Sequence, residues 1–76
     1  MPRITKDITV VPAYGRDYKN KLDAEADFKK GMDFLIQDIS CPYNGRYCSI
    51  NDLQGYRVKI RYNKLQRVTI VEVPHD

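Results

Sequence analysis

The 76-residue chain has no tryptophan, one histidine and two cysteines, so it offers little material for a metal or catalytic site. The histidine, His75, stands beside the end of the sequence, and a zinc site would need two ligands besides the cysteines. Four potential nucleophiles lack a neighbouring general base: Ser40, Cys41, Cys48 and Ser49. The four glycines are spread over separate turns, which excludes a phosphate-binding glycine loop. We therefore expect a non-enzymatic protein with no cofactor and no metal.

Long apolar runs are also absent. The longest, at residues 34–36, is far shorter than the roughly 20 residues needed to span a bilayer. The opening Met1-Pro2-Arg3 has no apolar core of the signal-peptide type, so we expect a cytoplasmic protein that does not contact the membrane. In a reducing compartment Cys41 and Cys48 are expected to be free thiols, although the turn between them could bring them within disulfide range.

The composition indicates one small folded domain over residues 1–76. Hydrophobic residues make up 42% and charged residues 30%, which is close to ordinary globular usage. A chain of this length is expected to bury only about 60% of its unfolded surface, so its stability should be marginal. Formation of a homodimer, or binding to a partner, would add to that stability.

Periodicity predicts one helix and four strands. Asn20 can cap a helix over residues 21–30, in which Ala24, Phe28 and Met32 form an apolar stripe and Gly31 ends the helix. Alternating or β-branched segments predict the strands, and Ser49 begins a short helical turn over 49–53. The expected strands span residues 7–11, 33–39, 56–62 and 67–73. This β-α-β-β-β order predicts an α+β fold in which a small, mainly antiparallel four-stranded sheet packs one face against the helix.

The third of these strands carries two interleaved patterns. Val58, Ile60 and Tyr62 alternate with three cations, so one face of the strand should be apolar and the other a cationic ladder. The ladder consists of Arg57, Lys59 and Arg61. Alternating charge on an exposed strand also prevents sheet edges from pairing, and this simpler explanation stays open.

Charge is unevenly distributed along the chain. Residues 22–38 hold five acids and two lysines, a net charge of −3, whereas residues 56–67 hold five cations and no acid, a net charge of +5. If the helix covers one face of the sheet, the basic ladder faces outward and attracts phosphates or an acidic protein. The overall charge of +3 is modest for a protein that binds nucleic acid.

Six tyrosines dominate the aromatic residues, and two loops share a local theme. In residues 14–18 and 43–47 an arginine near a glycine is bracketed by tyrosines. Tyrosine and arginine are over-represented at binding hot spots, and they also stack on unpaired bases. The alternative is that the rings cover the core while their hydroxyls stay hydrated. The candidate contact residues are Tyr14, Arg16, Tyr18, Tyr43, Arg46 and Tyr47.

Several sequence segments together resemble those of small uncharacterised proteins encoded by bacteriophages and prophages. They are residues 14–19, the Gly-x-Asp-Phe step at 31–34, the turn at 42–45 and the closing segment 58–65. The similarity spans about residues 8–71 and carries no catalytic or binding residues. It implies a mobile-element accessory protein that works in the cytoplasm of a bacterial host.

Together these patterns favour a binding module that engages nucleic acid through the basic sheet face and the Tyr/Arg loops. A different class of function fits the same residues, namely a small inhibitor that binds and blocks a host protein with an acidic surface. A structural component of the virion is a third alternative.

Overall fold

The computed structural model describes residues 6–74. The strands are β1 (Lys6–Pro12), β2 (Phe34–Ile36), β3 (Tyr47–Cys48), β4 (Tyr56–Arg61) and β5 (Val68–Val73). One α-helix, α1 (Lys21–Lys29), connects β1 to β2, and a 3₁₀ turn, η1 (Ile50–Leu53), precedes β4. The α+β class with a single α-helix is therefore confirmed, and so is the helical turn before the third predicted strand.

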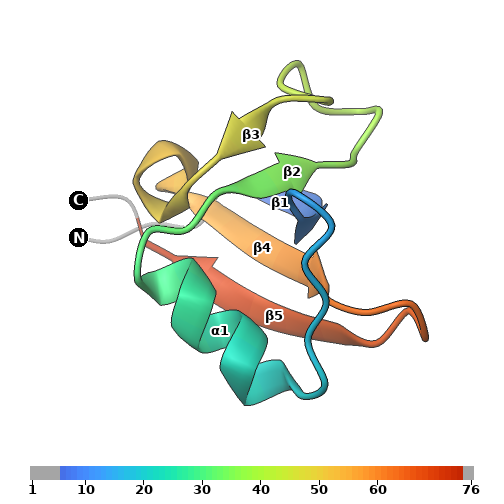
Figure 1. Ribbon diagram of the computed structural model, residues 1–76. Helices are drawn as coiled ribbons and strands as arrows, with labels where there is room; N and C mark the ends of the chain where they lie inside the picture. The colour runs from blue at the N-terminus through green and yellow to red at the C-terminus, as the bar shows by residue number, and fades with distance from the viewer. Residues whose placement is uncertain (1–5, 75–76) are drawn as a thin grey trace.

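The sheet has five strands in the order β3-β2-β1-β4-β5 and is mixed (Figure 1). β1 runs parallel to β4, while the other three neighbouring pairs are antiparallel. The prediction of four strands was wrong because β3 has only two residues and follows directly from a turn. That turn folds back on β2 through backbone hydrogen bonds, in which Gly45 donates to Ile36 and Ile36 to Arg46. For the same reason β2 is shorter than the strand expected over 33–39.

The helix begins and ends where its local signals predict. The Asn20 side chain accepts a hydrogen bond from the Asp23 amide at 3.0 Å, and Gly31 leaves the helix with a φ of 92°. Ala24 and Phe28 are buried, as the apolar stripe predicts. Met32 is exposed instead, because the helix stops at Lys29 and the chain has already changed direction at Gly31.

The core lies between α1 and one face of the sheet. Phe28 meets Phe34 edge-on, with ring centroids 5.6 Å apart. The alternation predicted for β4 is confirmed, because Val58 and Ile60 are fully buried and Tyr62 nearly so. α1 lies across the β5 side of this face (Figure 1), where Glu25 accepts a hydrogen bond from the Thr69 hydroxyl.

The opposite face of the sheet carries no helix among the described residues, and we call it the open face. Strand alternation and the pairing registers assign its side chains. They are Asp7, Thr9 and Val11 of β1, Leu35 of β2, Tyr47 of β3, Arg57, Lys59 and Arg61 of β4, and Val68, Ile70 and Glu72 of β5. The open face is thus partly basic and partly apolar, not a purely cationic surface.

Candidate nucleic-acid interface

The cationic ladder of β4 is partly neutralised. The Nε of Arg57 lies 2.9 Å from a carboxylate oxygen of Asp7 on the neighbouring strand, and this is the one salt bridge within residues 6–74. The hydrogen bond to Asp7 and the charge of that carboxylate raise the pKa of Arg57, and Glu72, its partner in β5, adds to the effect. The charge of Arg57 is therefore partly balanced by Asp7, and Lys59 and Arg61 are the two cations of the predicted ladder without a salt bridge within residues 6–74.

Lys59 stands at the centre of the open face. It is exposed, and its neighbours across the sheet are Thr9 of β1 and Ile70 of β5. A shallow groove of about 380 Å³ runs over this region, and Lys59 lines it together with Asp7, Asp38 and Arg57. The groove is therefore mixed in charge, and Lys59 is the cation that it leaves without a salt bridge among the described residues.

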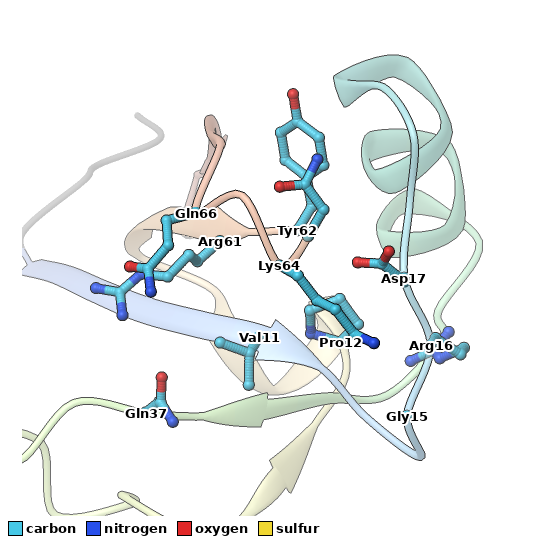
Figure 2. Close-up of a pocket in the computed structure, with 11 residues that line it drawn as sticks. Val11, Pro12, Gly15, Arg16, Asp17, Gln37, Arg61, Tyr62, Lys64 and Gln66 are labelled. Carbon is cyan, nitrogen blue, oxygen red and sulfur yellow. The ribbon is translucent and has the colours of Figure 1, made fainter.

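Arg61 lies in a second hollow, where β1 and β4 end together. This cleft has a volume of about 310 Å³ and contains Lys64 from the β4–β5 turn. In Figure 2, Gln37 and Val11 approach it from the side of β1 and β2, and Arg61 and Gln66 from the side of β4. The lining holds three cations (Arg16, Arg61 and Lys64), three side-chain amides (Gln37, Asn63 and Gln66) and one acid, Asp17. Such a set can bind a phosphate and hydrogen-bond to the groups attached to it.

The two Tyr/Arg loops meet near the β3 edge of the sheet. The rings of Tyr14 and Tyr47 stack with centroids 5.1 Å apart and planes 9° from parallel. Both remain accessible, with 71% of Tyr14 and 52% of Tyr47 exposed. Tyr14 has a φ of 60°, which non-glycine residues rarely adopt, and its hydroxyl donates to Asp33 at 3.3 Å. We call this pair the tyrosine platform, since it presents flat aromatic surface to the solvent.

Tyr18, by contrast, is part of the core, and the half-buried Arg16 is bonded to its edge. The guanidinium of Arg16 lies 5.1 Å from the ring centroid of Phe34 and donates to the backbone carbonyls of Ala13 and Asp33. It also donates to the Tyr18 hydroxyl, which in turn donates to Asp27 at 2.7 Å. Burial and the hydrogen bond to Asp27 raise the pKa of Tyr18 to about 12. Tyr18 is thus buried with its hydroxyl engaged, whereas Arg16 is half-buried and still lines the cleft that contains Arg61. Contact of either residue with a ligand stays a prediction.

The second loop keeps its polar residues in solvent. Tyr43 and Arg46 are exposed and line a groove of about 330 Å³ together with Tyr47, Cys48 and Asp52. Cys48 is half-buried there as a free thiol, and burial is the main reason why its pKa is raised. The two loops that look alike in sequence thus differ in role, because only the first is bonded into the core.

One row of the open face connects the tyrosine platform to the cleft. Tyr47 pairs with Leu35, Leu35 pairs with Val11, and one step beyond Val10–Ile60 the register brings Val11 beside Arg61. Three strand spacings separate Tyr47 from Arg61, which is about 14 Å. The floor between them is apolar and half-buried. An aromatic stack and a cation therefore stand at opposite ends of a continuous strip.

Sequence patterns alone did not indicate Gln37 and Gln66 as site residues. They come from segments far apart in the chain, and only the sheet order β2-β1-β4 brings them to one cleft. Lys64 was visible as part of the basic segment 56–67, but its place beside Arg61 depends on how the β4–β5 turn folds. Asn63 shapes that turn by accepting hydrogen bonds from the amides of Leu65 and Arg67.

Within residues 6–74, no cluster of three or more histidine, cysteine or acidic side chains could hold a metal ion. In the same range, no helix has the length and apolarity required to cross a membrane. No protein-family model matches the sequence, and comparisons with curated proteins and with solved structures also find no significant match.

Proposed function

We propose that this protein binds single-stranded nucleic acid on the open face of its sheet, between the tyrosine platform and the cleft at Arg61. The observation that carries the proposal is the shared row that joins Tyr47 to Arg61. Proteins that bind single strands combine aromatic rings on which bases stack with cations that follow the backbone. The resemblance to phage proteins suggests the cytoplasm of a bacterial host as the setting.

Charge and shape favour a single strand over a duplex. The acids of α1 belong to the covered side of the molecule, whereas Lys59, Arg61 and Lys64 belong to the open face and its end. Few cations are available, so affinity from phosphates alone would be modest. Stacking on Tyr14 and Tyr47 supplies the remainder, and it requires bases that are not paired in a helix.

Fluorescence anisotropy with labelled single-stranded DNA, duplex DNA and RNA tests the proposal. Titrations between roughly 50 and 200 mM salt resolve the number of phosphate contacts. We expect tighter binding to single strands than to the duplex. The double variant Lys59→Ala/Arg61→Ala should weaken binding to single strands of every sequence and lower the salt slope by about two.

Arg57→Ala is the matched control, since it removes a cation from the same strand that is already paired with Asp7. It should change the affinity and the salt slope much less than the double variant. Equal losses in both variants, or unchanged binding in the double variant, would contradict the proposed interface.

A second candidate function is the blocking of a host protein, and one observation favours it. Ile39, in the loop between β2 and β3, is 94% exposed, and Tyr43, four positions later in the same loop, is 43% exposed. Exposed apolar and tyrosine side chains in one loop are typical of an anchor in a protein interface. Ile39→Ser should then abolish capture of a specific host protein from nuclease-treated lysate and leave nucleic-acid affinity unchanged.

A further inference from the structure

β5 is an edge strand. It spans Val68–Val73 and pairs with β4, and no strand of residues 6–74 lies on its other side. At the opposite edge of the sheet β3 has two residues, so it offers little backbone for pairing. β5, with six residues, is long enough to accept another strand.

The register shows which backbone groups of β5 point outward. Tyr62 donates its amide hydrogen to the carbonyl of Arg67, and the pairs of an antiparallel ladder alternate between hydrogen-bonded and non-hydrogen-bonded. The residues of β5 that face β4 are therefore Thr69, Val71 and Val73. The amides and carbonyls of the three intervening residues point away from the sheet, and these are Val68, Ile70 and Glu72.

The usual protections of an edge are few on this strand. β5 contains no proline, glycine or lysine, and its one charged residue is Glu72. α1 covers the side on which Thr69 lies and leaves Val68 and Ile70 41% and 54% exposed. An exposed, β-branched edge of this kind is a template for pairing with another strand.

We propose that the partner of this edge is a second copy of the chain, and that two β5 strands pair antiparallel to form one continuous ten-stranded sheet. A two-fold axis perpendicular to the sheet keeps both open faces on the same side. This symmetry can pair even-numbered residues of one β5 with even-numbered residues of the other. The outward backbone groups of one protomer then meet those of its partner. The register that pairs all three places Ile70 opposite the partner's Ile70, and Val68 opposite the partner's Glu72.

Charge complementarity favours a second copy over an unrelated strand. In this register Glu72 lies beside the partner's Val68, and the next strand along the same row carries the partner's Arg61. Arg61 forms no salt bridge among the described residues, so its long side chain is free to reach the partner's carboxylate. The symmetry repeats this contact at the other end of the paired strands.

The pairing uses the backbone edge of β5 and leaves the tyrosine platform free, but it shares Arg61 with the proposed nucleic-acid interface, so the dimer is tested without nucleic acid. Six residues a side make a small interface, so we expect a monomer–dimer equilibrium that depends on protein concentration. Analytical ultracentrifugation over a concentration series measures this equilibrium directly.

Ile70→Lys tests the contact at its centre, because it places two lysines opposite each other across the two-fold axis. The dimer dissociation constant should rise by about tenfold or more. Leu65→Lys is the matched control: it makes the same change at an exposed apolar residue in the adjoining turn and should leave the equilibrium unchanged. Circular dichroism checks that both variants are folded. A monomeric native protein at its highest soluble concentration, or an Ile70→Lys variant that dimerises as the native protein does, would overturn the proposal.

Single cysteines, introduced after Cys41→Ser and Cys48→Ser, test the register. Opposite residues of a hydrogen-bonded antiparallel pair have Cα atoms about 5.5 Å apart, which a disulfide can span. Ile70→Cys should therefore form a covalent dimer on mild oxidation, and a mixture of Val68→Cys and Glu72→Cys chains should form the mixed dimer. Val68→Cys alone should stay monomeric on a denaturing gel, because its two copies are about 14 Å apart. Efficient cross-linking of Val68→Cys, or none of Ile70→Cys, would contradict this pairing.

Discussion

The guanidinium of Arg16 lies 5.1 Å from the centre of the buried Phe34 ring, so this half-buried charged residue packs against the core. Its hydrogen bonds tie the loop after β1 to the start of β2 and to the Tyr18 hydroxyl. Arg46, which holds the similar place in the second loop, remains exposed. Similar local sequences therefore stabilise the fold in the loop at residues 14–18 and leave exposed side chains in the loop at residues 43–47.

This contrast predicts different costs for two similar substitutions. Arg16→Ala should lower the free energy of unfolding by about 2 kcal/mol, because it removes several charge-assisted hydrogen bonds and leaves partly buried carbonyls without a donor. Arg46→Ala should leave stability unchanged, since it removes only an exposed side chain. Urea denaturation of both variants makes the comparison. An equal effect of the two substitutions would show that Arg16 does not support the fold.

The hydrogen bond of Tyr18 predicts a loss of stability at alkaline pH. The pKa of Tyr18 is raised from 10.0 to about 12 in the folded protein, because the neutral phenol is buried and donates to Asp27. The stabilisation is fully present below pH 10 and is lost as the pH rises towards 12, since the unfolded chain then releases this proton more readily. Tyr18→Phe should be less stable at neutral pH and should lose less stability over this range. Thermal unfolding at a series of pH values tests both expectations, and parallel curves for the two proteins would refute them.

Removal of the carboxylate that pairs with Arg57 should strengthen nucleic-acid binding. Asp7→Asn frees a third cation on the open face, so affinity should rise at low salt and the salt slope should steepen by up to about one. Exposed ion pairs contribute little to stability, so the midpoint of thermal unfolding should barely change. The double variant Asp7→Asn/Arg57→Ala is the control and should bind like the native protein. If Asp7→Asn leaves the salt dependence unaltered, Arg57 lies outside the interface.

The tyrosine platform predicts a loss that depends on the type of nucleic acid. Tyr47→Ala should weaken binding to single strands by about tenfold and leave the salt slope unchanged, because it removes stacking and no charge. Binding to duplex DNA should be affected much less, since paired bases cannot reach the ring. Tyr43→Ala, an exposed tyrosine outside the stacked pair, is the matched control in the same anisotropy assay. Equal losses on single strands and duplexes would contradict a stacking role.

The sequence by itself determined the helix at α1, the two faces of β4 and the α+β class. These features depend on local signals: a capping Asn20, a glycine at the helix end, and strict alternation between apolar and charged residues. Such signals act within a few residues, so they can be identified without knowledge of the rest of the chain.

Only the tertiary structure decided which charged and aromatic residues remain available. Strand β3 is held by its pairing with β2, and Arg57 is neutralised by Asp7, which is fifty positions away in the sequence. The stack of Tyr14 on Tyr47, the contact of Arg16 with Phe34 and the outward edge of β5 likewise arise from the sheet order. Contacts between distant segments depend on how strands are ordered and registered, and local patterns do not encode that order.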